Sequence, residues 1–116
     1  MSEYKNLIYE IENGIGLLTI NRPKALNALN AELMQELDNL LDEIAKDESV
    51  KVVIVTGSGD KAFVAGADIT HMQPMSAVEG RNWGKWGQAV MNKLENLPQT
   101  VIAAVNGFAL GGGNEL

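Results

Sequence analysis

The sequence has no cysteine and only one histidine, His71, among its 116 residues. Without cysteine there is no disulfide framework, no thiol nucleophile and no cysteine-ligated zinc site. One histidine cannot build a histidine-based metal cluster either. We therefore expect no metal or redox cofactor, and we interpret His71 as a bystander to any chemistry.

Basic residues and long apolar runs are also scarce. Nine Lys and Arg residues stand against fifteen Asp and Glu, which gives a net charge of −6, and no basic cluster offsets it. This charge argues against nucleic acid or an anionic membrane as a partner. No apolar run is long enough to span a bilayer, and the polar start at residues 1–6 is not a signal peptide. The expected location is the cytoplasm.

Strand patterns are present in three parts of the chain. Apolar-rich runs at residues 7–11 and 15–20 flank Asn13-Gly14, which predicts a β-hairpin with a tight turn. The β-branched run Val52–Val55 and the segment Thr100–Val105 predict two strands that are buried on both faces. We expect these two strands to be parallel neighbours.

Two amphipathic helices are predicted between the strands. Asn30 is a candidate N-cap for a helix over residues 31–47, and Ser76 starts the capping-box pattern of a helix over 77–97. The resulting order, β-β-α-β-α-β, is typical of an α/β fold. A further helix that begins at Gly111 has barely one turn before the sequence stops. We therefore expect residues 1–116 to be the N-terminal part of a single, truncated domain.

The stretch Val105–Leu116 combines a strand end, a glycine cluster and the carboxylate of Glu115. Glycines at the start of a helix expose backbone N–H groups at the positive end of the helix dipole, which suits an anion. Glu115 would repel a permanent phosphate. The pattern therefore favours a negative charge that develops only during a reaction, with Glu115 as the proton-transfer group.

A second copy of this pattern lies upstream. Each copy follows a strand that ends in a polar residue and glycine, Thr56-Gly57 and Asn106-Gly107. When Phe63 is aligned with Phe108, Ala67 falls opposite Gly112. Two stacked units of this kind place both positions at equivalent ends of adjacent strands. Their backbone N–H groups then form a candidate oxyanion hole.

Three linked motifs point to a family. The segments are N-R-P-K-A-L-N-A-L (21–29), F-V-A-G-A-D-I (63–69) and N-G-F-A-L-G-G-G-N-E-L (106–116). Together they resemble the crotonase (enoyl-CoA hydratase/isomerase) superfamily, in order and spacing, over the whole chain. Short-chain enoyl-CoA hydratases, including 3-hydroxybutyryl-CoA dehydratases, are the most similar members.

The resemblance implies a spiral of repeated β-β-α units and the reversible addition of water to 2-enoyl-CoA thioesters. CoA is then part of the substrate and not a cofactor. Members of the family form trimers and hexamers, so the resemblance also implies a homo-oligomer. Completion of the domain by a second polypeptide is the other arrangement that we expect for so short a chain.

Site residues are also implied by the resemblance. The backbone N–H groups of Ala67 and Gly112 match the family's oxyanion hole, and Glu115 matches the first of two catalytic glutamates, the second of which lies further along the family's chain. The positions that match segments lining the CoA site are Lys24, Ala25, Leu26, Ala65, Asp68 and Ile69.

Simpler interpretations stand beside these. The glycine cluster fits a tight strand–helix connection, Glu115 fits a first-turn helix residue, and Asp68 fits a cap. Lys24 fits a plain surface charge, and Trp83 and Trp86 fit the core or an interface. Within the family, an enoyl-CoA isomerase can work with one carboxylate. From a different class, the chain fits a catalytically silent acyl-CoA-binding fragment.

Overall fold

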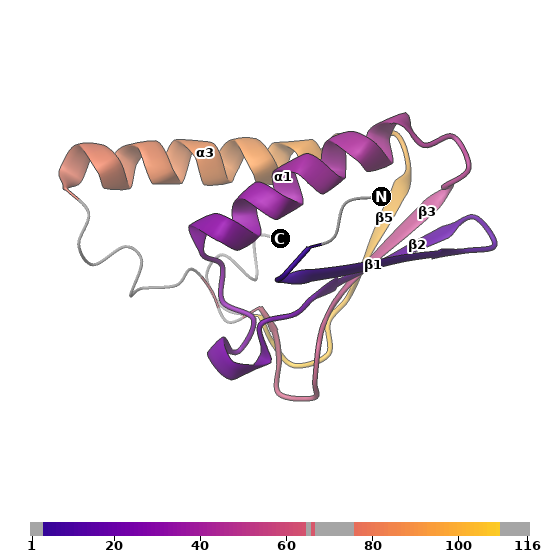
Figure 1. The fold of residues 1–116 in the computed structure, drawn as a ribbon, viewed down its shortest axis with the longest axis horizontal. Coiled ribbons are helices and arrows are strands. Elements are labelled where there is room, and N and C mark those ends of the chain that lie inside the picture. Colours follow the sequence, from indigo (N-terminus) through magenta and orange to yellow (C-terminus); the bar gives the residue numbers. More distant parts are fainter. Residues whose placement is uncertain (1–3, 65, 67–75, 110–116) are drawn as a thin grey trace.

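The computed structural model describes residues 4–64, 66 and 76–109. Four strands form one sheet in the order β1-β2-β3-β5, and β4 and β6 form a second sheet of two strands. Both long helices lie on the same side of the larger sheet (Figure 1). The elements are β1 (Leu7–Glu12), β2 (Ile15–Ile20), the 3-10 helix η1 (Pro23–Ala25), α1 (Ala31–Lys46), β3 (Val52–Gly57), β4 (Ala62–Val64), α3 (Ala77–Glu95), β5 (Thr100–Ala104) and β6 (Phe108–Ala109).

The predicted hairpin is confirmed. β1 pairs with β2 in antiparallel register, from Leu7 opposite Ile20 to Glu12 opposite Ile15. At the turn, Asn13 has φ 52° and Gly14 has φ 79°. Two successive left-handed residues are what a tight two-residue hairpin turn requires, and Asn-Gly supplies them at the lowest steric cost.

The predicted parallel pair is also confirmed. β3 lies between β2 and β5 and is parallel to both, with Ile54 opposite Leu17 on one side and Ile102 on the other. Parallel neighbours need a crossover, and helices α1 and α3 provide the two crossovers here. The carboxyl ends of β2, β3 and β5 therefore meet at one end of the sheet.

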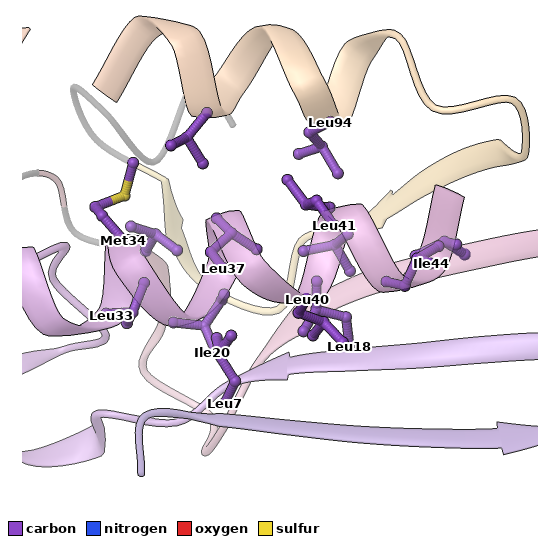
Figure 2. Close-up of a cluster of buried hydrophobic side chains, with 14 of the residues drawn as sticks. Leu7, Leu18, Ile20, Leu33, Met34, Leu37, Leu40, Leu41, Ile44 and Leu94 are labelled. Carbon is purple, nitrogen blue, oxygen red and sulfur yellow. The ribbon is translucent and has the colours of Figure 1, made fainter. Parts of the chain in front are cut away.

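Helix α1 covers the sheet because its apolar residues recur on one face. Asn30 caps it as predicted, accepting a hydrogen bond from the Leu33 N–H at 2.9 Å. Side chains of α1 point onto Leu7, Leu18 and Ile20 of the hairpin, and Leu94 of α3 packs from the opposite side (Figure 2). The buried residues of α1 are Leu33, Met34, Leu37, Leu40, Leu41 and Ile44.

Helix α3 confirms the second predicted helix. Ser76 accepts from the Glu79 N–H at 3.2 Å, and Val90 and Leu94 are buried. Trp83 and Trp86 are half-buried and pack against the core, with their rings edge to face and the centroids 5.5 Å apart.

The prediction that the two parallel strands are buried on both faces is wrong. β3 alternates between buried and half-buried residues, and in β5 all but the half-buried Val101 are exposed. The reason is that both helices cover the same face and β5 lies at an edge of the four-stranded sheet. The opposite face carries apolar side chains that nothing in the described chain covers.

Candidate functional site

The loops that follow β2, β3 and β5 gather at one end of the larger sheet (Figure 1). The loop after β2 holds residues 21–29, the turn after β3 leads into β4, and Asn106-Gly107 leads from β5 into β6. In open sheets with parallel strands, ligands bind outside the carboxyl ends of the strands. This junction is the candidate site.

The loop after β2 is a closed, hydrogen-bonded unit. Its backbone bonds include Ala25 N–H to the Arg22 carbonyl at 3.0 Å and Asn27 N–H to the same carbonyl at 2.8 Å. Arg22 Nη1 adds a 2.6 Å bond to the Ala28 carbonyl. Leu26 and Asn27 both have left-handed backbones, with φ 52° and 58°. A left-handed backbone is sterically unfavourable for leucine. Such strain persists only where surrounding hydrogen bonds fix the chain.

Asn27 is buried in this junction, with 1% of its surface exposed. Its Nδ2 donates to the carbonyls of Ser58 at 3.1 Å and Ala62 at 3.0 Å. Its Oδ1 accepts from the Arg22 N–H at 2.9 Å and the Ser58 hydroxyl at 3.3 Å. An asparagine amide has two donor hydrogens and two acceptor lone pairs, so all of its capacity is used. Asn27 thus ties the β2 loop to the turn before β4.

Asn106 holds the same turn from the other side. Its Nδ2 donates to the Gly59 carbonyl at 2.9 Å and to the Ala62 carbonyl at 3.0 Å. Its Oδ1 accepts from the Gly57 N–H at 3.0 Å. The carbonyl of Ala62, the first residue of β4, therefore receives two side-chain amides, one from each neighbouring loop.

Two strand-end glycines make this convergence sterically feasible. A Cβ on Gly57 would lie 2.6 Å from the Ala62 carbonyl oxygen and would overlap the Phe63 carbonyl oxygen. A Cβ on Gly107 would lie 2.8 Å from the Ala62 nitrogen and would overlap the Lys61 carbonyl oxygen. Real Cβ atoms do not approach backbone this closely. The sequence shows a polar residue followed by glycine at two strand ends, Thr56-Gly57 and Asn106-Gly107. The two glycines allow the backbone of β4 to approach closely.

The short sheet of β4 and β6 was not predicted from the sequence. Its strands are parallel, with Ala62 opposite Phe108 and Val64 opposite Ala109, so the register shifts by one residue within β4. The pair Val64 and Ala109 is the register that the alignment of Phe63 with Phe108 requires. The two glycine-containing segments therefore leave adjacent parallel strands.

Gly66 is attached to the β2 loop. It is buried and has φ 110°, a conformation that favours glycine. The Leu29 N–H donates to its carbonyl at 2.8 Å. The chain is therefore held at a defined position two residues after β4.

The structure places the predicted site residues unevenly. Lys24 and Leu26 are exposed, and Ala25 is half-buried. Lys24 and Ala25 line a hollow of about 300 Å³, and Leu26 lines another of about 240 Å³ beside the turn after β3. The predictions for Ala65, Ala67, Asp68, Ile69, Gly112 and Glu115 lie outside the described residues.

Two negative findings apply to the described part of the chain. Within it, no group of three or more His, Cys, Asp and Glu residues could hold a metal ion. No helix in the same ranges is long and apolar enough to cross a membrane.

Comparison with known proteins now decides the family. The sequence profile described as Enoyl-CoA hydratase/isomerase matches residues 10–116. The chain belongs to this family. A short-chain-enoyl-CoA hydratase of Clostridium acetobutylicum is 54% identical over 114 residues, and a crotonyl-CoA hydratase of Syntrophomonas wolfei is 52% identical over 113. These matches cover 98% and 97% of this chain but 44% of each relative.

Solved structures of the family share the fold. The crystal structure of an enoyl-CoA hydratase from Bacillus anthracis superposes with a TM-score of 0.93 at 38% sequence identity. That match covers 96% of this chain and 43% of the other. The predicted crotonase-like α/β fold is therefore confirmed, and the chain spans less than half the length of the relatives it matches.

Sequence reasoning missed the part that Asn27 and Asn106 play in the junction. Both residues lie within the quoted motifs, yet only the fold shows that their amides meet at the Ala62 carbonyl. The one signal available beforehand was the polar residue next to each strand-end glycine.

Proposed function

We propose that this chain contributes the oxyanion hole and one catalytic carboxylate of an enoyl-CoA hydratase. The substrate is a short or medium 2-enoyl-CoA thioester, to which water is added reversibly, with no cofactor other than the CoA that the substrate carries. The enzyme acts in the cytoplasm as a homo-oligomer.

In the proposed reaction the N–H groups of Ala67 and Gly112 donate to the thioester oxygen. Glu115 takes a proton from water as the water oxygen bonds to the β-carbon, and the π electrons move onto the thioester oxygen. Glu115 then gives this proton to the α-carbon as the carbonyl re-forms, so the substrate gains one water molecule and the carboxylate is regenerated. Loss of one such oxyanion donor typically lowers the rate by ~10²–10³.

The observation that carries the proposal is the parallel pairing of β4 with β6. Val64 lies opposite Ala109 in adjacent parallel strands, and Ala67 and Gly112 each follow these paired residues by three positions in the sequence. This is the arrangement that two backbone donors need if they are to share one oxygen. The names of the two hydratases from Clostridium acetobutylicum and Syntrophomonas wolfei support the choice of reaction. Lys24, Ala25 and Leu26, together with Ala65, Asp68 and Ile69, are the proposed contacts to CoA.

The test is hydration of crotonyl-CoA by the full-length product of the gene that encodes this chain. We expect turnover that Glu115→Gln lowers by about 10²–10⁴-fold, because general acid–base catalysis contributes that much. Glu48→Gln is the control, since Glu48 is an exposed carboxylate outside the site and its loss changes the charge equally.

Two outcomes would contradict the proposal. Isomerisation of a 3-enoyl-CoA without hydration of crotonyl-CoA would assign the chain to the isomerases. Tight binding of crotonyl-CoA with no reaction would make it a silent acyl-CoA-binding protein.

A further inference from the structure

The strongest unassigned feature of the site is the hydrogen-bonded path from Asn27 to Gly66. Asn27 holds the Ala62 carbonyl at the start of β4 through its Nδ2, 3.0 Å away. Two residues further along the β2 loop, the Leu29 N–H holds the Gly66 carbonyl at 2.8 Å. One short loop thus fixes the segment 62–66 at both ends.

The bond to Gly66 has a direct geometric consequence. A trans peptide group is planar, and its N–H points opposite to its C=O. The carbonyl of Gly66 shares its peptide group with the N–H of Ala67. The Leu29–Gly66 bond is therefore made to the same peptide group that carries the proposed donor N–H.

We propose that Asn27 is a positioning residue for the oxyanion hole, acting through β4 and the Leu29–Gly66 bond on the Ala67 N–H. This inference rests on the proposed function. Asn27 has only 1% of its surface exposed, so it acts through the groups that it bonds. Its backbone is left-handed, with φ 58°, two residues before Leu29. Its fully used amide holds the turn and strand that Gly66 follows.

The same loop carries Lys24, Ala25 and Leu26, the proposed CoA contacts. Backbone bonds close this part of the loop without the Asn27 side chain, from Ala25 N–H and Asn27 N–H to the Arg22 carbonyl. Loss of the Asn27 amide should therefore disturb the oxyanion hole more than the CoA contacts. This difference separates positioning of the donor from general disruption of the site.

Two variants test the proposal in the full-length gene product. Asn27→Asp keeps the size of the side chain but turns a carboxylate oxygen toward the carbonyls of Ser58 and Ala62. Asn27→Gly keeps the left-handed backbone, which glycine adopts freely, and removes only the amide. Asn39→Asp is the matched control, because Asn39 is exposed on α1 and its side chain accepts from Gln35 of the same helix.

We expect both Asn27 variants to lower kcat and kcat/KM for crotonyl-CoA together by about 10²-fold, with KM little changed, since a displacement of about 1 Å can cost that much. Asn39→Asp should leave both constants unchanged. Activity is counted per folded molecule, well below the melting temperature. If Asn27→Asp does not fold, Asn27→Gly carries the test.

A second readout distinguishes positioning from a purely structural role. Acetoacetyl-CoA can bind as an enolate, which places negative charge in the oxyanion hole and absorbs in the ultraviolet, whereas butyryl-CoA binds without enolising. Asn27→Gly should weaken acetoacetyl-CoA binding and its enolate absorbance much more than butyryl-CoA binding. Equal weakening of both ligands, or an unchanged kcat, would overturn the inference. A wild-type protein without hydratase activity would overturn the proposed function, and this inference with it.

Discussion

Tyr9 of the hairpin carries a buried hydroxyl group. Its ring lies over Gly16 in the hairpin, where a Cβ would come within 2.9 Å of ring carbons. The Tyr9 hydroxyl is buried and has no hydrogen-bond partner among the described residues. Burial, and then the negative charge of Asp47, raise the pKa of Tyr9 above its usual value.

Tyr9→Phe should raise the free energy of unfolding by about 1 kcal/mol near neutral pH, because a buried unpaired polar group costs about 1–3 kcal/mol. Because the pKa of Tyr9 is raised in the folded state, protonation of Tyr9 contributes fully to the free energy of unfolding below pH ~10. This contribution is lost as the pH rises through the pKa of the folded state. The variant should therefore lose stability less steeply in alkali than the wild type. Denaturant unfolding from pH 7 to 11 measures both effects.

The control for this comparison is Tyr4→Phe. The Tyr4 hydroxyl lies at the surface and contacts Glu43 at 3.5 Å, so its removal should change stability less than removal of the Tyr9 hydroxyl. Asp38 and Asp42 raise the pKa of Lys93. The ion pairs of Lys93 with these two residues weaken in the same alkaline range, and they do so in every variant. A wild type and a Tyr9→Phe variant with the same alkaline slope would contradict the assignment.

Residues whose structural role depends on neighbours in sequence were predictable. Asn30 caps α1 through Leu33, three residues away, and Asn13-Gly14 forms the hairpin turn by its own backbone preference. Asn27 was not, because its amide bonds Ser58 and Ala62, far along the chain. The strands β4 and β6 were not predicted, because they are too short to show a period.

The glycine at the end of β3 and the glycine in the middle of α3 have opposite surroundings. Gly57 leaves room for β4, whereas Gly84 in α3 has nothing within 4 Å of an added Cβ. We expect Gly57→Ala to destabilise the protein by about 1–3 kcal/mol, as overpacking does. Gly84→Ala should stabilise it by about 0.5–1 kcal/mol through helix propensity.

Paired melting and denaturant curves for the two alanine variants test this contrast. The same substitution then acts with opposite sign at a packed and an open position. A Gly57→Ala variant as stable as the wild type would show that β4 can move away from β3 without cost.

Within the described residues, helices cover one face of the larger sheet and leave the other face without a layer. Side chains alternate along a strand, so Leu17, Ile54 and Ile102, which lie side by side in register, share the face away from the helices. Leu17 is 36% exposed and Ile102 is 49% exposed. An apolar row of this kind favours association.

We expect the 116-residue chain alone to sediment as a dimer or larger species. Leu17→Lys combined with Ile102→Lys should shift it toward monomer, because a charge on this face opposes its burial. Val78→Lys is the control, since Val78 is exposed at the start of α3, away from the sheet. A wild-type monomer that melts cooperatively would contradict the expectation.

The spatial order of the strands in the larger sheet follows their order in the chain. Proteins are synthesised from the N-terminus, so the β1–β2 hairpin can form first and each later strand can add to the edge left by the one before. While α3 is being synthesised, β3 has not yet paired with β5, and β4 has not yet paired with β6. Both unpaired edges are templates for wrong pairing during that interval. Of the described elements, the pairings at the sheet end that carries the candidate site therefore form last on the ribosome, and a translational pause within α3 prolongs the exposure of these edges.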